Sequence, residues 1–358
     1  MADELALRAL GWDDGLEASW RDLGAPGTPG RVSRLDRGWS TVLTGPDPGD
    51  LDDVTRVRNI GADVAVGDWV VASADGERVE LVLPRRSAFV RRASFEGARA
   101  EADTLAANID VVFLTHSFGN PPNQRRLERE LVLAFDSGAD PVVVLTKADL
   151  VDDPEPARRE LVEVAFGVPV LITSGRRGTG VEELRTFAHG HRTLAFLGSS
   201  GAGKSTLVNA LLGADVQATT EVRTGDQRGR HTTVAAELLP LPGGGWLVDT
   251  PGVRALSLWL SGEGIERAFA DVFELMERCR FRDCKHDQEP GCAVLAAIAE
   301  GALDPDRWAS LERLVAEEVT LEAEQRAKAK TADRRRGGRR PPDAAESADV
   351  DDDRDQDA

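Results

Sequence analysis

Long apolar runs are absent from this chain of 358 residues, and cysteine is scarce. No stretch approaches the roughly 20 consecutive apolar residues that a membrane-spanning helix needs, which argues against an integral membrane protein. The three cysteines all lie between residues 279 and 292. An odd number of clustered cysteines, in a sequence without a signal-peptide-like N-terminus, argues against a disulfide framework. We therefore expect a cytoplasmic protein with reduced cysteines.

Lysine is scarce as well. Lysine and arginine together number 44, yet only five of these residues are lysines. Two of the five, Lys147 and Lys204, lie in motifs of the kind that bind nucleotides. A lysine ammonium is a compact charge on a flexible stem, and the planar guanidinium of arginine does not replace it. Lysine at these two positions indicates that both motifs are functional.

Positive charge is in deficit too. The formal net charge is −18 at pH 7, which is unexpected for a nucleic-acid-binding protein. Part of the deficit is local, because residues 343–358 hold eight acidic residues and one arginine, whereas 328–340 hold seven basic residues and one aspartate. Such blocks predict a disordered tail over 328–358. Its basic half either contacts RNA or is the solvated end of a helix.

A phosphate-binding loop of the form G-x-x-x-x-G-K-S/T begins at Gly198 and is preceded by a strand-like run and followed by a helical pattern. Glycines let backbone N–H groups curl around phosphates at a helix N-terminus, where the dipole favours an anion. Lys204 would reach the β- and γ-phosphates, and the Ser205 hydroxyl would bind Mg²⁺. The expected nucleotide contacts of this loop are Gly198, Ser199, Ser200, Gly201, Ala202, Gly203, Lys204, Ser205 and Thr206.

Upstream of this loop, Thr146-Lys147-Ala148-Asp149 resembles the guanine-specificity motif N/T-K-x-D of GTPases. It follows the β-branched run 141–145, which is typical of a buried parallel strand. The Asp149 carboxylate can accept hydrogen bonds from N1–H and the 2-amino group of guanine, and adenine offers neither. The motif therefore predicts selection of GTP over ATP. Thr173-Ser174-Gly175, after the apolar run 168–172, is the candidate for a second base-contacting loop, with Ser174 as its expected contact.

Asp249 and Gly252 form a D-x-x-G motif at the end of a short apolar strand. Asp249 would support the Mg²⁺ shell, and the Gly252 N–H would sense the γ-phosphate. Val253 then stands where many GTPases hold a glutamine that positions water, and a valine cannot orient water. We expect slow intrinsic hydrolysis, or another residue in that role.

The stretch from Gly229 to Thr233 lies between the phosphate loop and D-x-x-G, where the first switch of a GTPase is expected. One of Thr232 and Thr233 would bind Mg²⁺ through its hydroxyl, and the sequence does not say which. His231 is the candidate residue for assisting hydrolysis.

The order of these motifs is unusual. In an ordinary GTPase the phosphate loop comes first and the base-reading motif near the end, whereas here Asp149 precedes Gly198. The sequence therefore predicts a circularly permuted P-loop GTPase. The permutation sends the chain from D-x-x-G directly into the segment that contains the cysteines, so the nucleotide-sensing loop is covalently continuous with that module.

The cysteine segment has the spacing C-x4-C-x-H-x5-C. Three thiolates and one imidazole form a closed tetrahedral set, which is typical of a structural zinc site with no open position for catalysis. The alternative is three buried free thiols with an unrelated histidine. The predicted ligands are Cys279, Cys284, His286 and Cys292. The remaining histidines, His116 among them, are expected in loops or at the surface.

The rest of the chain divides by pattern. From residue 30 to about 94, short alternating segments separated by turns predict a five-stranded OB-type β-barrel, a fold that typically binds oligonucleotides. From residue 109, strands and helices alternate as in a doubly wound α/β sheet. Helices are expected at 265–278, 293–300 and 306–328. The arginines of the barrel segment make it locally basic: Arg31, Arg34, Arg37, Arg56, Arg58, Arg85, Arg86, Arg91 and Arg92.

The predicted domains are an N-terminal extension (1–29) without an assigned role, the OB-type barrel (30–94), the permuted GTPase domain (95–260), a helical zinc-binding domain (261–327) and the charged tail. Together, the barrel, the motif order, G-R-H-T-T, D-T-P-G and the cysteine spacing closely resemble the family of ribosome-small-subunit-dependent GTPases (RsgA, YjeQ or YloQ). The resemblance covers about residues 30–325. Thr146 stands where asparagine is commoner, which the family pattern allows.

The resemblance implies an α/β fold with both flanking domains, one structural Zn²⁺ and Mg²⁺ with GTP. It implies a monomer that binds the small ribosomal subunit and its rRNA, assists late maturation, and hydrolyses GTP under stimulation by the subunit. The family histidine proposed to assist hydrolysis maps onto His231. Two alternatives stay open: a P-loop kinase or ATPase, which Asp149 argues against, and an RNA-binding scaffold that senses GTP with little turnover.

Overall fold

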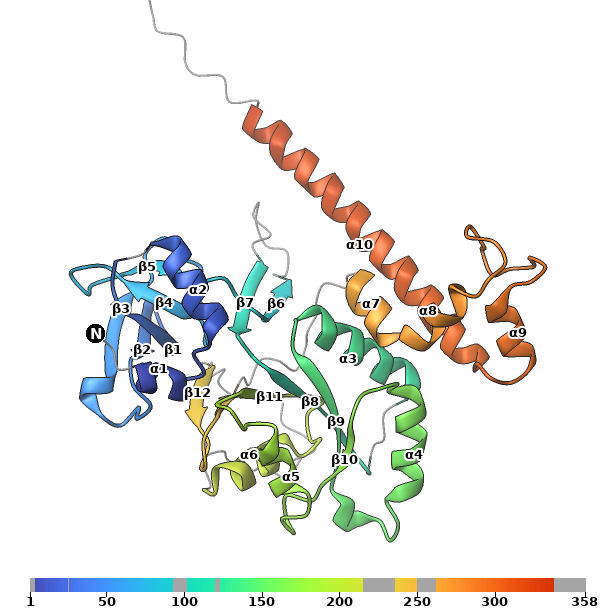
Figure 1. Ribbon diagram of the computed structural model, residues 1–358, viewed down its shortest axis with the longest axis horizontal. Helices are drawn as coiled ribbons and strands as arrows, with labels where there is room; N and C mark the ends of the chain where they lie inside the picture. The colour runs from blue at the N-terminus through green and yellow to red at the C-terminus, as the bar shows by residue number, and fades with distance from the viewer. Residues whose placement is uncertain are drawn as a thin grey trace, which may run out of the picture.

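The structure is a computed structural model that describes residues 4–24, 26–92, 102–119, 123–214, 236–249 and 262–337. Figure 1 shows a β-rich N-terminal part beside a central α/β part, with a C-terminal group of helices from which the long helix α10 projects. Across these residues, no helix combines the length and the apolar character needed to cross a membrane.

The central part is a doubly wound sheet. Its order is β10-β9-β8-β11-β13, all parallel, with β12 antiparallel at the end. The strands are β8 (Val111–Ser117), β9 (Asp140–Thr146), β10 (Val170–Ile172), β11 (Thr193–Leu197), β12 (Glu237–Pro240) and β13 (Trp246–Asp249). The helices are α3 (Gln124–Asp136), α4 (Glu155–Val164), α5 (Val181–Thr186) and α6 (Lys204–Leu212).

The strand order confirms the predicted permutation. β11, which leads into the phosphate loop, lies in the middle of the sheet between β8 and β13. The chain nevertheless enters the sheet at β8 and β9, the base-reading half, and reaches β11 only afterwards. The carboxyl ends of parallel strands form one edge, where ligands of α/β proteins bind. Permutation changes the order along the chain and keeps that edge intact.

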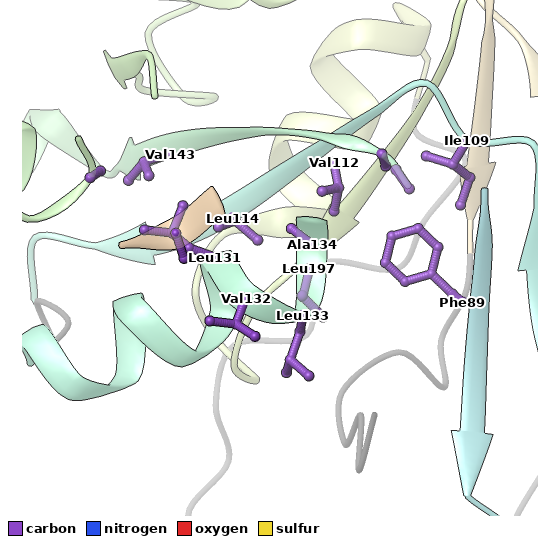
Figure 2. Close-up of a cluster of buried hydrophobic side chains, with 14 of the residues drawn as sticks. Phe89, Ile109, Val112, Leu114, Leu131, Val132, Leu133, Ala134, Val143 and Leu197 are labelled. Carbon is purple, nitrogen blue, oxygen red and sulfur yellow. The ribbon is translucent and has the colours of Figure 1, made fainter. Parts of the chain in front are cut away.

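Helices bury both faces of this sheet, which explains its continuous apolar strands. One face packs against α3, and Figure 2 shows Leu131 and Val132 of that helix beside Leu114 and Leu197 of the strands. The opposite face packs against α5 and α6 through a second cluster that includes Phe113 and Phe196. The two layers hold the strand ends, and the loops that follow them, in fixed positions.

The predicted OB-type barrel is confirmed. Its strands are β1 (Pro29–Asp36), β2 (Trp39–Leu43), β3 (Val54–Arg58), β4 (Trp69–Ala72) and β5 (Val79–Val82). β1 pairs with both β2 and β4, β2 pairs with β3, and β4 pairs with β5. A parallel bridge between Arg58 and Arg78 brings the end of β3 to the start of β5 and closes the circle. Five valines fill the interior: Val32, Val42, Val57, Val70 and Val79.

The barrel and the GTPase sheet form one continuous sheet of 11 strands. The join is an antiparallel pairing of β1 with β12, in register at Arg34 and Glu237. A hairpin of β6 (Ala88–Arg92) and β7 (Ala102–Ala107) makes a second connection between the two parts.

The N-terminal extension has a structural role that the sequence did not predict. It forms α1 (Glu4–Ala9) and α2 (Asp14–Leu23), with Asp13 capping α2 through a 2.9 Å hydrogen bond from the Leu16 N–H. Between the helices, Trp12 packs edge-on against Trp69 of the barrel, with ring centroids 4.8 Å apart. The Trp246 indole N–H of the GTPase sheet donates to the Ala9 carbonyl at 2.9 Å. The extension therefore fastens the barrel to the GTPase domain.

Arg31, one of the arginines predicted to make the barrel segment locally basic, lies at the centre of this junction and not at the surface. It is 1% exposed. Its guanidinium donates to the Leu10 carbonyl at 2.5 Å, the Asn108 carbonyl at 3.1 Å and the Thr193 hydroxyl at 2.7 Å. One side chain thus joins the extension, the barrel and the GTPase sheet. Burial lowers the pKa of Arg31 to about 10, which leaves it charged at neutral pH.

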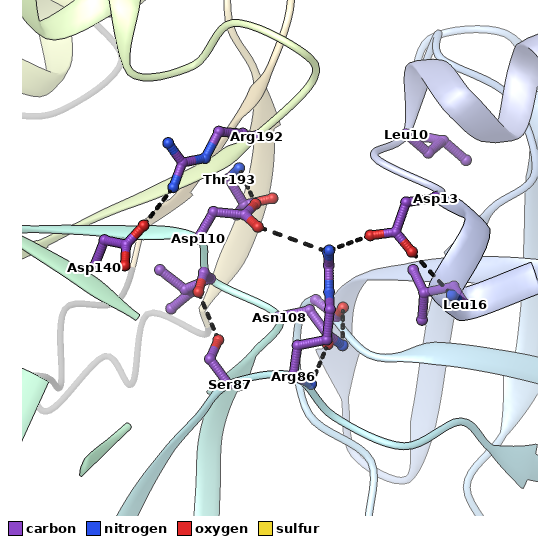
Figure 3. A network of polar contacts seen from close by, with 12 residues as sticks. Leu10, Asp13, Leu16, Arg86, Ser87, Asn108, Asp110, Asp140, Arg192 and Thr193 are labelled. Atoms are coloured by element: carbon purple, nitrogen blue, oxygen red, sulfur yellow. Dashed lines mark hydrogen bonds and ion pairs between the residues drawn. The ribbon is translucent and has the colours of Figure 1, made fainter. Parts of the chain in front are cut away.

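Arg85 and Arg86 are also committed to structure. Arg85 forms a two-pronged ion pair with Asp68, at 2.8 Å to each carboxylate oxygen. Figure 3 shows Arg86 between Asp13 of the extension and Asp110 of the GTPase domain. The side chains of Arg91 and Arg92 lie outside the part that the structure describes. Of the arginines predicted to make the barrel basic, the described ones that are exposed are Arg34, Arg37, Arg56, Arg58 and Arg86, and Arg86 is held by its two ion pairs.

The C-terminal helices are α7 (Gly262–Ala268), α8 (Ala270–Met276), α9 (Ala293–Ala299) and α10 (Pro305–Gly337). The predicted helix 265–278 is two helices, because the backbone at Phe269 leaves the helical region (φ −118°, ψ 31°). α10 continues beyond the predicted end at Lys328, so the basic block to Gly337 is helical rather than disordered. Alanine, lysine and arginine favour helix, and Gly337 is the first breaker after Pro305.

Candidate nucleotide and metal sites

The phosphate loop connects β11 to α6, which begins at Lys204. Two of its glycines are required by close contacts. A Cβ on Gly198 would lie 2.4 Å from the Thr115 carbonyl, and one on Gly203 would lie 3.0 Å from the Thr146 hydroxyl. Gly203 also has φ +97°, a conformation that side chains other than glycine rarely adopt. The loop is therefore packed directly against the ends of β8 and β9.

The Lys204 ammonium folds over the loop that carries it. Its Nζ donates to the Gly198 carbonyl at 2.7 Å and to the Ser199 carbonyl at 2.6 Å. Both acceptors are backbone oxygens at the start of the loop, so the positive charge of Lys204 is held beside the first residues of the phosphate loop. Ser205 and Thr206 follow in the first turn of α6, where backbone N–H groups have no helical partners and can bind an anion. The local geometry is that of a phosphate cradle.

Thr146 ties the base-reading motif to the phosphate loop. It is 1% exposed, and its hydroxyl donates to the Ala202 carbonyl. The following residue, Lys147, adopts the left-handed conformation with φ 61°, which turns the chain sharply after β9. Asp149 then lies in a short 3₁₀ turn, Ala148–Leu150. The predicted motif is thus held by the loop that it must work with.

Ser174 and Asp149 come together as the sequence suggested. The Ser174 hydroxyl donates to Asp149 Oδ1 at 2.5 Å. This hydrogen bond lowers the pKa of the Asp149 carboxyl, so the group is ionised at neutral pH. The Ala148 N–H donates to the Thr173 carbonyl at 3.1 Å, and the Thr173 N–H donates to the Leu145 carbonyl at 2.7 Å. These backbone bonds fix the second loop beside the first.

A pocket of about 230 Å³ opens between these loops. It brings residues of the base-reading motif together with residues of the phosphate loop and α6. Its lining is Thr146, Lys147, Asp149, Leu150, Gly175, Arg176, Gly203, Thr206 and Leu207. The pocket is concave and partly apolar, with one carboxylate at its wall, which suits a planar base that carries N–H donors.

Three of the lining residues were not predicted, namely Leu150, Arg176 and Leu207, whereas Gly175 belongs to the loop 173–175 that was predicted to contact the base. Gly175 is the informative one, because a Cβ there would lie 2.9 Å from Thr206 Cγ2 and 3.1 Å from the Thr206 carbonyl. A glycine after the second base-contacting serine is the signal that this loop passes close to α6. Leu150, which is 60% exposed, follows Asp149 directly and forms part of the pocket wall.

Asp249 ends β13 at the same edge of the sheet, as predicted. Its cross-strand partner is Glu237 of β12. Gly252, Val253, His231, Thr232 and Thr233 lie outside the described residues. Their expected roles in sensing the γ-phosphate, in binding Mg²⁺ and in hydrolysis stay predictions. The structure brings together the base-reading and phosphate-binding halves of the site.

The predicted zinc ligands converge. The ligand atoms of Cys279, Cys284, His286 and Cys292 all lie within 4.8 Å of one another. Cys279 Sγ is 3.6 Å from His286 Nδ1 and 4.0 Å from Cys292 Sγ, and His286 Nδ1 is 3.4 Å from Cys292 Sγ. A tetrahedral zinc about 2.3 Å from sulfur sets its ligand atoms roughly 3.5–3.8 Å apart. The donor set and spacing fit one structural zinc.

The surroundings of the cluster hold its ligands in place. The Ala293 N–H donates to Cys279 Sγ at 3.3 Å, and the Leu295 N–H donates to Cys292 Sγ at 3.4 Å, so both thiolates lie at the N-terminus of α9. Glu289 closes the loop by accepting from the backbone N–H groups of Lys285, Asp287 and Gln288, which lowers its pKa to about 2. Backbone donors and a helix N-terminus stabilise thiolate charge.

One expectation outside both sites was wrong. His116 lies on β8 and is 2% exposed, not in a loop or at the surface. Its Nε2 is 2.9 Å from the Glu130 carboxylate of α3, so a polar partner accommodates the imidazole there.

Known proteins share both the sequence and the fold. Residues 82–259 match the family described as RsgA GTPase. A relative from Streptomyces coelicolor named "Small ribosomal subunit biogenesis GTPase RsgA" is 44% identical over 347 residues, which covers 94% of this chain and 93% of that protein. A relative of the same name from Methanosarcina acetivorans is 38% identical over 314 residues, with coverage of 86% and 84%.

Solved structures agree in fold. YjeQ from Thermotoga maritima superposes with a TM-score of 0.60 at 26% identity, covering 82% of this chain and 98% of that chain. YloQ, described as a circularly permuted GTPase, superposes with a TM-score of 0.58 at 24% identity, covering 82% and 95%. The family match, the similar relatives and the permuted sheet with its guanine-type pocket agree. The chain belongs to the RsgA family of GTPases.

Proposed function

We propose that this protein hydrolyses GTP to GDP and phosphate while bound to the small ribosomal subunit, and that it assists the maturation of that particle in the cytoplasm. The observation that carries the proposal is the Asp149–Ser174 pair at the wall of the pocket beside the phosphate loop. It selects guanine, and the relatives that share this chain's length and sequence are named for small-subunit biogenesis.

In this mechanism Asp149 accepts from the guanine edge, and Lys204 neutralises the phosphates. Ser205 and one of Thr232 and Thr233 would hold Mg²⁺ with GTP, supported by Asp249. Bound Mg²⁺ neutralises charge that develops on the phosphates. His231 assists the attacking water, because Val253 cannot orient it. Loop backbone from Gly198 to Gly203, with the first turn of α6, receives the phosphates through N–H groups.

One structural zinc per chain, held by Cys279, Cys284, His286 and Cys292, would stabilise the C-terminal module. Its four ligands are all protein atoms, so it has no part in the chemistry. Binding energy at such a site is also folding energy. The zinc therefore sets the shape of the module that follows the D-x-x-G motif.

An exposed face of the barrel supports contact with RNA. Trp39 of β2 pairs in register with Arg58 of β3, and Arg56 lies two residues away on the same face. The Arg58 and Arg56 guanidinium carbons lie 5.0 Å and 5.5 Å from the centroid of the Trp39 ring. An aromatic ring flanked by cations is a platform on which unpaired bases stack while arginines contact phosphates. We expect Trp39→Ala to weaken binding to the subunit and to leave GTP affinity unchanged.

The decisive experiment measures GTP and ATP turnover with and without purified small subunits, together with co-sedimentation in GDP and in a non-hydrolysable GTP analogue. We expect slow GTP turnover that the small subunit accelerates, no ATP turnover, and preferential binding in the GTP-like state. Asp149→Asn should lower GTP affinity, because an amide N–H then faces the guanine donors. Equal turnover of ATP and GTP would overturn the assignment. Binding to the subunit without any stimulated turnover would favour the GTP-sensing scaffold.

A further inference from the structure

The first turn of α10 carries a buried arginine that joins this helix to four others. Arg307 is 5% exposed, although arginine is rarely buried unless it is paired. It belongs to the C-terminal module, two residues after the helix begins at Pro305. Its partners belong to α3 and α4 of the GTPase domain and to α7 and α8 of the C-terminal module.

Every N–H of the Arg307 guanidinium has a partner. Nε and Nη2 form a two-pronged pair with Asp271, at 2.7 Å and 2.5 Å. Nη2 also donates to the Ala268 carbonyl at 3.0 Å, at the last residue of α7. Nη1 donates to Glu128 Oε1 and to the Val164 carbonyl, each at 3.2 Å. The fixed fork of arginine satisfies these directions together, and a lysine ammonium does not.

Packing around the guanidinium fixes the bend between α7 and α8. Phe269, the residue at which the backbone leaves the helical region, is fully buried, and the guanidinium carbon lies 4.7 Å from its ring centroid. α7 itself lies against α3 with almost no gap. A Cβ on Gly264 would lie 2.7 Å from the Val132 carbonyl and 2.0 Å from Asp136 Oδ1. α7 can therefore shift relative to α3 only if this contact and the Arg307 bonds change.

The contacts of Arg307 with α3, α4, α7 and α8, called the Arg307 joint below, lie close in the chain to both the nucleotide-sensing motif and the predicted zinc ligands. α7 is the first described element after residues 250–261, which contain Gly252 of the γ-phosphate-sensing motif. Directly after Arg307, Trp308 packs edge-on against His286, with ring centroids 5.4 Å apart. One turn of α10 thus contacts a predicted zinc ligand on one side and the end of α7 on the other.

Stability alone does not account for such a cluster. Replacing a buried ion pair by apolar residues is often neutral or stabilising, because desolvation offsets much of the attraction. The Glu128 carboxylate is fully buried, and within the described part of the chain its Oε2 has no hydrogen-bond partner. The bonds instead specify one arrangement of α10 relative to α3, α4, α7 and α8. A contact that allows only one arrangement transmits a displacement of one helix to the others.

We propose that Arg307 is a positioning residue for GTP hydrolysis: its bonds to Glu128, Asp271 and the end of α7 carry docking of the zinc-binding module to the segment that contains Gly252. This inference rests on the proposed stimulation by the small subunit. Loss of these bonds should leave nucleotide and particle binding intact, because Arg307 is buried and does not line the nucleotide pocket. It should reduce the conversion of binding into turnover.

The test compares Arg307→Met and Arg307→Lys with a matched control, Arg129→Met. Arg129 forms a 2.6 Å ion pair with Glu317 between the same two helices, α3 and α10, but both side chains are more than a third exposed. We expect Arg307→Met to lower the subunit-stimulated kcat by about tenfold, within the range of couplings measured for such residues. Basal turnover, GTP affinity, zinc content and the half-saturating subunit concentration should change little. Arg129→Met should behave as the native protein does.

Arg307→Lys separates geometry from charge. If the fork carries the coupling, the lysine variant should lose stimulation as the methionine variant does, whereas a purely electrostatic role predicts rescue and would overturn the proposal. Where Arg307→Met folds poorly because Glu128 is left unpaired, the double variant with Glu128→Gln removes the buried charge and gives the same comparison. Full stimulation in the folded double variant would also overturn it.

Hydrogen exchange gives a readout that does not depend on ribosomes. In the native protein, exchanging GDP for a non-hydrolysable GTP analogue should alter amide exchange in α7 and also in the first turn of α10. In Arg307→Met the change should stop at α7. If native protein shows no subunit stimulation, the proposed function fails, and this measurement alone decides Arg307. Identical exchange changes in the variant and the native protein would refute the joint.

Discussion

Ser174 donates a 2.5 Å hydrogen bond to Asp149, although the two residues belong to loops that follow different strands. Asp149 follows β9 and Ser174 follows β10, and the parallel pairing of these strands aligns their ends. A carboxylate held by one donor keeps its other oxygen oriented, and the pocket lies beside it. Guanine selectivity therefore depends on a contact between loops as well as on the motif.

Removing that contact should weaken guanine binding without abolishing it. Ser174→Ala leaves Asp149 charged but free to rotate, so we expect GTP affinity to fall by about tenfold, the order of one hydrogen bond to a charged group. Lys204→Ala, which removes the phosphate contact instead, should affect GTP and ATP alike. Isothermal titration with GTP, GDP and ATP distinguishes the two variants. An unchanged GTP affinity for Ser174→Ala would show that Asp149 is oriented without it.

The pH dependence of this variant has a defined sign. The bond from Ser174 lowers the pKa of Asp149 below its ordinary value of 3.8, so the charged form is present above that value and is lost only as pH falls through the lowered pKa. Even with the bond removed, the carboxyl stays ionised from about pH 6 to 8. The ratio of native to variant affinity should therefore be flat across that range.

Zinc removal should unfold the C-terminal module and spare the nucleotide site. Cys292 is buried in the same hydrophobic cluster as Phe269 and Val272, so loss of the cluster around it exposes apolar surface. We expect Cys284→Ser to lower zinc content well below one per chain and to reduce subunit binding, while GTP affinity stays near the native value. Metal analysis and co-sedimentation measure both. Unchanged zinc content in Cys284→Ser would count against the ligand assignment.

The N-terminal helices should contribute strongly to stability. Trp12 is 3% exposed and lies between Trp69 of the barrel and its own helix pair, so Trp12→Ala should cost about 3–5 kcal/mol. Leu23→Ala is the matched control, because Leu23 ends α2 and is 48% exposed, and such surface changes cost within about 0.5 kcal/mol. Thermal unfolding followed by circular dichroism compares the variants. Equal losses for both would mean that the Trp12 contact does not hold the junction.

The two kinds of site differ in how far the sequence predicts them. The phosphate loop, the base-reading motif and the zinc ligands depend on spacing over a few residues, and the structure brings each of these sets together. Even Gly175 carries a local signal, because a glycine after Ser174 marks a close backbone approach. Local chemistry is readable when the residues that perform it are neighbours in the chain.

The burial and the partners of Arg31 and Arg307 could not be predicted from the sequence in this way. Each looks like an ordinary surface arginine, and the partners that bury it lie 162 and 179 residues away in the chain at Thr193 and Glu128. The break at Phe269 was missed for the same reason, because its ring is buried in the core and packs against the distant Arg307. Helix propensity also extends α10 through its basic block, where the charge pattern alone suggested disorder. Long-range satisfaction of buried polar groups decides such features.

The last prediction concerns His231, in the segment that ends at β12. Glu237 of β12 is paired with Arg34 of the barrel on one side and with Asp249 on the other. A barrel docked on RNA is therefore bonded to the strand that anchors the predicted first switch. Ordering a switch loop against the γ-phosphate is how GTPases convert binding into turnover. Docking of the barrel would place His231 near the attacking water.

His231→Ala should consequently keep GTP binding and subunit binding, yet lose the stimulated rate by about a hundredfold, the usual size of a proton-transfer or water-positioning contribution. Single-turnover hydrolysis by the native protein and by His231→Ala, both at a saturating subunit concentration, isolates the chemical step from binding. A residue that only contacts RNA would instead raise the half-saturating subunit concentration when replaced and would spare the maximal rate. If His231→Ala shows that same pattern, His231 is an RNA contact and another group must orient the water.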